Sequence, residues 1–275
     1  MSAAKNEGTQ LFTISTLTKP LDPPRATRAA TRVASVDVEW TKNYRIKNGN
    51  RPFCLSIVWI DIPAGDQVVD VARLPYDFSS FYVESAEEVP DLVSTAGGVL
   101  RTALDSADLL TGHQLCADLG VLAAHSAPAP VTEAREAWHG RRTVPEAGPR
   151  IVDTRYDSGD LLTGTSRRLV DVCTELGLDV TQPELRGTSM TALHRQWLER
   201  GDTEARERVS TLNLRHSLST ALVAAAVAGL TSWSGTRPNV NSMIAHQAAG
   251  RWGWLQSETF KNLSEDQCPS GTARS

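Results

Sequence analysis

The sequence predicts an α/β fold in which a mixed β-sheet is flanked by helices. Along residues 33–40, apolar and polar side chains alternate, which is the pattern of a strand with one buried face. Farther along the chain, apolar residues recur at the three- to four-residue spacing of helices. Short apolar segments, typical of buried strands, lie between these helical stretches. Consecutive strands followed by alternating helices and strands are typical of a mixed sheet covered by helices.

The expected elements follow from this change of period. Strands are expected at residues 33–40, 53–62, 67–74, 107–112 and 150–154. Helices are expected at residues 86–104, 116–124, 131–140, 165–176, 189–199 and 203–230, the first with interruptions at Pro90 and Gly97-Gly98. Because short segments join the first three strands, we expect them to form an antiparallel meander.

The overall composition is that of an ordinary globular protein. The chain has 275 residues, of which 40% are hydrophobic and 22% are charged, enough for one large α/β domain or two small ones. Its formal net charge of -4 argues against a protein that coats duplex DNA. An enzyme that binds one strand end in a local cleft is still compatible with that charge.

Cysteine usage and hydropathy predict the compartment. The four cysteines lie far apart and form no CxxC pair, so we expect reduced thiols in a cytoplasmic protein. No apolar stretch approaches the ~20 residues of a membrane span, and the start of the chain lacks the apolar segment of a secretory signal. We therefore expect no membrane partner.

Composition also suggests the domain boundaries. Residues 1–32 are rich in Ser, Thr, Ala, Pro and Arg, which predicts a flexible and mildly basic N-terminal arm. The main domain is expected over residues 33–230, followed by a C-terminal extension over 231–260 that packs on it and a disordered tail over 261–275.

Asp37 and Glu39 lie two residues apart on the first predicted strand. Side chains at this spacing project from the same face of a strand, so both carboxylates can reach one metal site. The pattern Asp-x-Glu is common by chance, and the alternative interpretation is a solvated face of the sheet.

A second acidic residue follows the strand that ends at Gly112 and His113. Asp118 comes five residues after His113, in the first turn of the expected helix. This segment resembles the second motif of the DEDD (DnaQ-like) superfamily of 3′–5′ exonucleases, in which a strand ends in Gly-His-Asn and a following Asp binds metal. Gln114 stands at the Asn of that motif. By itself, Asp118 could simply interact with the helix dipole.

The long helix at residues 203–230 resembles the third motif of this superfamily, with departures. In one branch a Tyr precedes the metal-binding Asp by four residues, and these positions hold Leu212 and His216 here. In the other branch a His precedes the Asp by five residues, and from His216 that position is Ala221. His216 therefore stands where a fourth carboxylate is expected. It is either a ligand or base of the site, or a packed residue of the helix.

The resemblance implies a ribonuclease-H-like fold with a mixed five-stranded sheet, and a two-metal mechanism. It implies that Asp37, Glu39 and Asp118 bind Mg²⁺ or Mn²⁺, two ions about 3.5–4 Å apart. As a ligand, the neutral ring of His216 would weaken Mg²⁺ binding and favour Mn²⁺. As a base, it would use an ordinary pKa near 6.5.

Residues that bind the nucleic acid are expected beside the acidic residues. His113 belongs to the second motif, and Lys42, Tyr44 and Arg45 lie in the segment after the first strand, where Tyr44 could stack on a base. Solvated charges are the alternative interpretation. Arg141-Arg142, Arg167-Arg168 and Lys47 are further basic candidates for a phosphate backbone, and Asp153-Thr154 is expected to support the site. Trp252 and Trp254 could stack on bases, but we expect them instead to attach the C-terminal segment to the domain by hydrophobic contact.

Three hypotheses follow for the function. The first is a metal-dependent 3′–5′ exonuclease that hydrolyses RNA or single-stranded DNA ends. The second is a catalytically impaired protein of the same fold that binds nucleic acid or a protein partner, favoured by Leu212, His216 and the acidic net charge. The third is an unrelated α/β enzyme with coincidental matches. The sequence does not distinguish RNA from DNA, because recognition of the 2′-hydroxyl depends on contacts in space.

Overall fold

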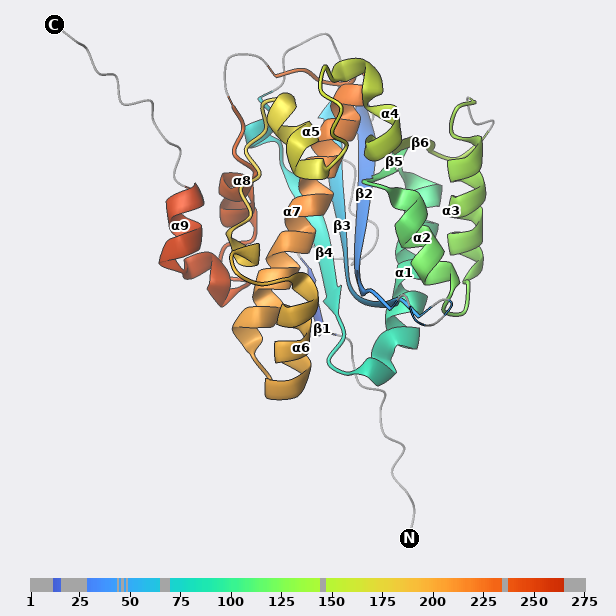
Figure 1. The fold of residues 1–275 in the computed structure, drawn as a ribbon. Coiled ribbons are helices and arrows are strands. Elements are labelled where there is room, and N and C mark those ends of the chain that lie inside the picture. The colour runs from blue at the N-terminus through green and yellow to red at the C-terminus, as the bar shows by residue number, and fades with distance from the viewer. Residues whose placement is uncertain are drawn as a thin grey trace, which may run out of the picture.

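A mixed six-stranded sheet with helices on both faces forms the centre of the computed structural model (Figure 1). The structure describes residues 12–15 (backbone only), 29–43, 45, 47, 49–64, 70–143, 147–233 and 237–264. The predicted fold class is confirmed: the strands and helices form an α/β architecture consistent with a ribonuclease-H-like arrangement.

The sheet combines an antiparallel half with a parallel half. Its strands are β1 (Phe12–Ser15), β2 (Ala30–Thr41), β3 (Arg51–Pro63), β4 (Tyr76–Tyr82), β5 (Leu109–Gly112) and β6 (Arg150–Asp153), in the spatial order β1-β4-β3-β2-β5-β6. Strands β2, β3 and β4 pair antiparallel, whereas β5 runs parallel to β2 and to β6. The short strand β1, which the sequence does not predict, pairs with β4 and brings the sheet from the expected five strands to six.

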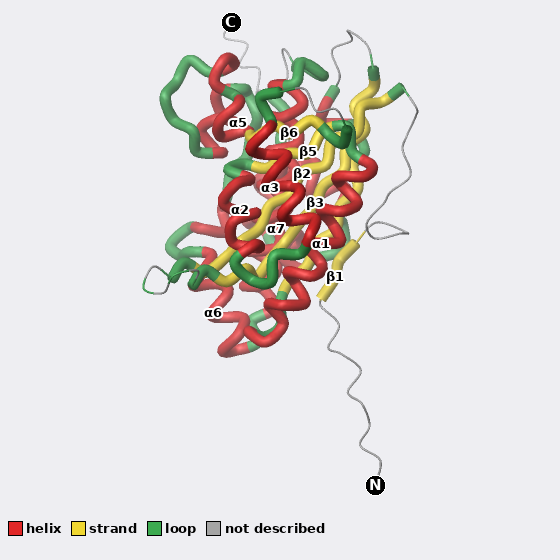
Figure 2. Tube along the Cα trace, turned by 90° about the vertical axis from the view of Figure 1, so that its right-hand side faces the viewer, coloured by secondary structure: helices red, strands yellow, loops and turns green. Residues whose placement is uncertain are grey.

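Helices cover both faces of this sheet. They are α1 (Val89–Ser106), α2 (Leu115–Ala123), α3 (Ala129–Gly140), α4 (Thr154–Asp157), α5 (Leu169–Glu175), α6 (Met190–Arg200), α7 (Thr203–Val227), α8 (Val240–Gln247) and α9 (Glu258–Ser264). Short 3-10 segments are η1 (Val71–Arg73), η2 (Ala86–Glu88), η3 (Gly159–Leu161), η4 (Pro183–Leu185) and η5 (Gly253–Gln256). Helices α1, α2 and α3 cover one face, and α7 crosses the other (Figures 1 and 2).

The alternation along β2 separates two hydrophobic clusters. Val36 and Val38 are buried together with apolar residues of α1 and α2. Val33 lies in the other cluster, with apolar residues of α7 and α8. Since successive side chains of a strand point to opposite faces, the odd-numbered residues that follow Val33 also face α7.

Helix α7 lies on β3 through small polar side chains. The hydroxyl groups of Ser56 and Ser217 are 2.7 Å apart, and Ser56 Oγ donates to the Asn213 carbonyl oxygen at 3.1 Å. Burial of these polar groups costs little free energy only because each of them has a hydrogen-bond partner. The contact therefore fixes α7 against the middle of β3, next to the polar end of β2.

A buried ion pair joins α7 to the segment before α6. Arg215 donates to both carboxylate oxygens of Glu184, at 2.6 and 2.8 Å, and both side chains are fully buried. Asn241 of α8 accepts from Arg215 Nε, and Trp254 of η5 donates to Glu184. The C-terminal elements are thus attached to α7 through one polar network.

The third strand of the meander is not where the sequence predicts it. Residues 65–69 lie outside the described part of the chain, Val71–Arg73 is the 3-10 segment η1, and the strand that pairs with β3 is β4. The sequence does not indicate β4, because its polar residues interrupt the alternation of apolar and polar side chains; these residues are Asp77, Ser79 and Ser80. Ser79 and Ser80 are buried.

Helix α1 continues through the predicted interruptions. Pro90 occupies its first turn, where the missing backbone N–H costs no hydrogen bond. Gly97 is inside the helix, and a Cβ at this position would lie 2.9 Å from Pro128. This glycine therefore permits the close approach of the segment before α3 and does not end the helix.

The element boundaries at the two ends also differ from the predicted ones. β1 lies within the predicted arm and β2 begins at Ala30, while the rest of residues 1–28 lies outside the described part of the chain. Residues 261–264, expected in the tail, complete α9, whose Phe260 is buried in the core. Within the described ranges, no helix combines the length and apolar character needed to cross a membrane.

Candidate active site

Asp37 and Glu39 project from β2 toward α7. Their pairing partners on β3 are Ser56 and Cys54, respectively. Both acidic side chains are largely buried, with 13% and 9% of the side-chain surface exposed. The alternation of β2 therefore places two carboxylates in the layer between the sheet and α7, and the solvated-face interpretation is wrong for both of them.

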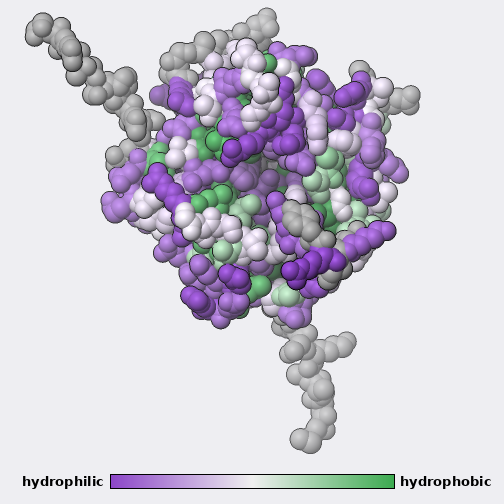
Figure 3. Space-filling view, viewed as in Figure 1, coloured by the Kyte–Doolittle hydropathy of each residue, from purple (hydrophilic) through white to green (hydrophobic). Residues whose placement is uncertain are grey.

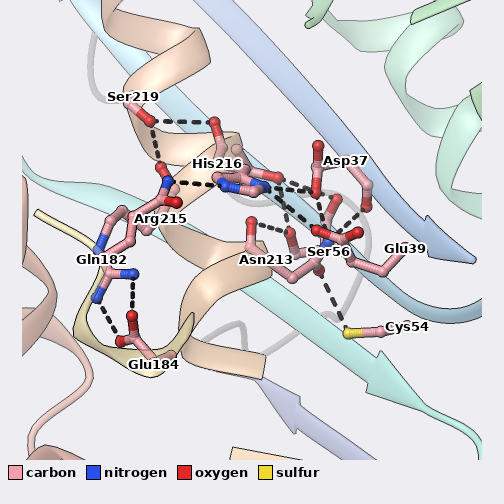
Figure 4. A network of polar contacts seen from close by, with 11 residues as sticks. Asp37, Glu39, Cys54, Ser56, Gln182, Glu184, Asn213, Arg215, His216 and Ser219 are labelled. Carbon is pink, nitrogen blue, oxygen red and sulfur yellow. Dashed lines mark hydrogen bonds and ion pairs between the residues drawn. The ribbon is translucent and has the colours of Figure 1, made fainter. Parts of the chain in front are cut away.

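His216 of α7 faces both carboxylates with one edge of its ring (Figure 4). Its Nδ1 is 3.2 Å from Glu39 Oε1 and 3.6 Å from Asp37 Oδ2. The imidazole is 18% exposed and therefore lines the site instead of packing in the apolar core. Ligand atoms of Asp37, Glu39 and His216 all lie within 4.8 Å of one another.

Asn213, one helical turn before His216, orients Asp37. Its Nδ2 donates to Asp37 Oδ2 at 2.6 Å and to the Asp37 carbonyl oxygen at 3.2 Å. The thiol of Cys54 donates to Asn213 Oδ1 at 3.5 Å. These contacts hold the Oδ2 oxygen of Asp37 in place.

Asp118 lies in the first turn of α2, near enough for the charges of Asp37 and Glu39 to act on it, but it is not one of the residues whose ligand atoms lie within 4.8 Å of one another. The helix begins there because Gln114 adopts a left-handed conformation with φ 65°, and Asp153 Oδ1 accepts a hydrogen bond from the Gln114 backbone at 2.9 Å. Asp118 is 3% exposed, and its Oδ2 has no hydrogen-bond partner within the described residues. Burial, together with the charges of Asp37 and Glu39, raises the pKa of Asp118 well above its ordinary value.

The electrostatics of the site are dominated by crowded acids and one imidazole. Burial and the charge of Asp37 raise the pKa of Glu39. Burial by itself lowers the pKa of His216, but its hydrogen bonds and charge interactions with Asp37 and Glu39 outweigh burial and raise the pKa to about 10. Without a cation, protonated His216 thus compensates part of the negative charge.

His113 and Asp153 border the site from the neighbouring strand ends. His113 Nδ1 is 3.0 Å from Thr154 Oγ1, and burial lowers the pKa of His113 to about 4, so the ring is neutral at pH 7. Asp153 accepts from the backbones of Gln114 and Arg155 and from Trp138 Nε1. Because its oxygens are engaged, Asp153 supports the start of α2 and does not reach the cluster.

The structure does not bring the predicted basic residues to the carboxylates. Lys42 and Arg45 are exposed, and neither makes an ion pair with the cluster among the described residues; Tyr44 lies outside them. Arg141 pairs with Asp157 at 3.1 Å. Trp252 and Trp254 are buried in the core beside α7 instead of being available for stacking on bases.

Sequence reasoning missed two residues of the site. Asn213 lies three residues before His216, a spacing that places both on one helical face and could have revealed it. Gln182, whose Nε2 is 3.0 Å from His216 Nε2, gives no such signal. It lies in an irregular segment, and only the tertiary structure brings it to α7.

The cluster fits a divalent cation. Two carboxylates and an imidazole lie within reach of one ion, and these are donor types that Mn²⁺ and Mg²⁺ accept, with the nitrogen donor favouring Mn²⁺. The unpartnered oxygen of Asp118 is the kind of buried polar atom that a cation satisfies. The side of the molecule that contains this layer is hollowed near its centre, and hydrophilic residues line the hollow (Figure 3).

Comparison with known sequences adds no constraint on the reaction. No protein-family model and no curated protein matches the chain. The function is therefore inferred from the residues of the site and their geometry.

Proposed function

We propose that the protein is a divalent-metal-dependent 3′–5′ exonuclease that hydrolyses phosphodiester bonds at the ends of RNA or single-stranded DNA. The observation that carries the proposal is the convergence of Asp37, Glu39 and His216, whose ligand atoms lie within 4.8 Å of one another, with buried Asp118 beside them. The ribonuclease-H-like arrangement of the sheet is compatible with it.

In this proposal Asp37, Glu39 and Asp118 hold the cations, Mg²⁺ or Mn²⁺. When bound, such ions activate water and stabilise charge on the leaving oxygen. The chain itself keeps the donors in place: Asn213 orients Asp37, and the α2 start fixed by Asp153 presents Asp118. His216 completes the donor set. Its raised pKa makes it unsuited to accept a proton from water while the site lacks a cation.

A second candidate function has an observation in its favour. Protonated His216 faces both Asp37 and Glu39 and compensates part of their charge in the absence of a cation. This favours a catalytically impaired protein of the same fold that binds single-stranded nucleic acid or a protein partner. The two candidates differ in whether bound oligonucleotides are shortened.

The deciding experiment uses end-labelled RNA and DNA oligonucleotides with purified full-length protein in Mg²⁺ or Mn²⁺. We expect stepwise shortening from the 3′ end, greater in Mn²⁺. Asp37→Asn should abolish it, whereas the matched variant Asp91→Asn, at an exposed position of α1, should not. Binding without shortening in either metal would overturn the exonuclease proposal and support the impaired protein.

The compartment belongs to the same proposal. Cys54, Cys116 and Cys173 are free thiols in the structure. Free thiols are typical of proteins in a reducing compartment. We therefore propose a cytoplasmic location, where single-stranded RNA ends are accessible substrates.

A further inference from the structure

Gln182 contacts the side of the His216 ring that faces away from the carboxylates. Gln182 Nε2 is 3.0 Å from His216 Nε2, while Nδ1 of the same ring is 3.2 Å from Glu39 Oε1 (Figure 4). Both ring nitrogens therefore have polar partners. Turning the ring by half a rotation would break the contacts on both sides, so its orientation is defined.

The segment that carries Gln182 is itself fixed to α7. Glu184, two residues after Gln182, forms the fully buried ion pair with Arg215, the residue before His216. Arg208, also on α7, donates to the Glu184 carbonyl oxygen at 2.6 Å. Two neighbouring links thus join the same two segments, and the Gln182–His216 contact does not depend on a cation to form.

The chemistry of a primary amide suits this position. An amide offers a donor and an acceptor, and half a turn about its last bond exchanges them. In the structure, Nε2 of Gln182 faces the ring. It can donate to Nε2 of a neutral imidazole that carries its proton on Nδ1. A ring protonated on both nitrogens, and equally a ring that donates its Nδ1 lone pair to a cation, requires Oε1 to accept the proton on Nε2.

We propose that Gln182 is a positioning residue of the site: it accepts the Nε2 proton of His216 and keeps Nδ1 directed at Asp37, Glu39 and a divalent cation. This inference rests on the proposed function only in requiring a cation site, and it does not require cleavage.

The test compares Mn²⁺ affinity, measured by electron paramagnetic resonance, in full-length wild type, Gln182→Leu and Gln182→Glu. Gln182→Leu removes both polar atoms at similar volume, and we expect about a 10- to 100-fold loss of affinity. Gln182→Glu keeps an acceptor and should retain the affinity. Gln256→Leu, at an exposed position of η5, is the matched control and should bind like wild type. Circular dichroism establishes that each variant is folded.

A second measurement is independent of the variants. In ¹⁵N-histidine spectra of the wild type with Zn²⁺ as a diamagnetic probe, His216 should carry its proton on Nε2 and none on Nδ1. A proton on Nδ1 overturns the inference, as does equal Mn²⁺ affinity in Gln182→Leu or a loss in Gln182→Glu as large as that in Gln182→Leu. Wild type that binds Mn²⁺ without cleaving oligonucleotides overturns the exonuclease proposal alone. Wild type that binds no cation overturns both.

Discussion

Glu39 Oε1 and His216 Nδ1 lie 3.2 Å apart, although 177 residues separate them in the chain. The contact joins the end of β2 to the middle of α7 across the layer that Asn213 and Ser56 also occupy. The imidazole of His216, when protonated, carries a positive charge next to the two carboxylates, which would otherwise repel each other. The consequences for stability and for metal choice can both be measured.

The first prediction concerns pH and stability without metal. The pKa of folded His216 is raised from 6.5 to about 10, so its protonation stabilises the fold fully below about pH 6.5, and this contribution is lost as the pH rises through about 10. We expect His216→Leu to lower the free energy of unfolding most near the lower end of this range and progressively less toward the upper end. Urea denaturation in EDTA measures the difference.

The control for this pH series is His246→Leu, because His246 is exposed on α8. Its effect on the free energy of unfolding should be small and nearly independent of pH. A His216→Leu effect that stays constant or grows with pH would show that His216 is not protonated beside the carboxylates.

The second prediction is that Asp118→Asn stabilises the metal-free protein. The pKa of Asp118 is raised by burial and by the neighbouring acids, so above its ordinary pKa of 3.8 this carboxyl group reduces the stability of the fold. Replacing it with a neutral amide should raise the melting temperature in EDTA by about 2–4 °C for each kcal/mol recovered. Calorimetry measures this change.

Asp118→Asn should at the same time weaken Mn²⁺ binding, because an oxygen donor loses its charge. Asp91→Asn, at an exposed position in the first turn of α1, should leave Mn²⁺ binding unchanged and lower the melting temperature slightly, because a favourable charge at the helix start is lost. A variant at position 118 that is less stable in EDTA, yet binds Mn²⁺ like wild type, would assign Asp118 a structural role only.

The third prediction concerns the ion pair beside the site. Arg215 and Glu184 are both fully buried, so Arg215→Met leaves an uncompensated carboxylate and should cost about 3–5 kcal/mol of unfolding free energy. Adding Glu184→Leu should restore much of the lost unfolding free energy, because the double variant contains no buried carboxylate without a positive partner. Urea denaturation of the three proteins measures it, and equal stability of the single and double variants would contradict the argument.

The sequence predicts much of the sheet and the carboxylates on it, because alternation and strand ends are local signals. Asp37 and Glu39 follow from the period of β2, and Asp118 from a strand that ends just before a helix. The predicted position of the third strand is wrong, because the serines of β4 are polar and yet buried beside β3. Whether a polar residue is buried depends on the tertiary structure, which local sequence patterns do not show.

The unpredicted part of the site depends on contacts between distant segments. Nothing local indicates that Gln182 meets His216, since their approach is fixed by the ion pair of neighbouring Glu184 and Arg215. The role of His216 was likewise open in the sequence, where a packed residue and a site residue have the same helical spacing. Its distance of 3.2 Å to Glu39 distinguishes the two.

The last prediction tests His216 as the fourth ligand. His216→Asp replaces the nitrogen donor with a carboxylate, and Mg²⁺ prefers oxygen donors. We expect the ratio of Mg²⁺-supported to Mn²⁺-supported cleavage to rise by about tenfold, which corresponds to roughly 1.4 kcal/mol. In EDTA the same variant should be less stable than wild type, because a further carboxylate then faces Asp37 and Glu39 without a compensating cation. Cleavage rates in each metal and melting temperatures in EDTA measure both effects. Loss of cleavage in both metals, with Mn²⁺ binding retained, would instead assign His216 to proton transfer.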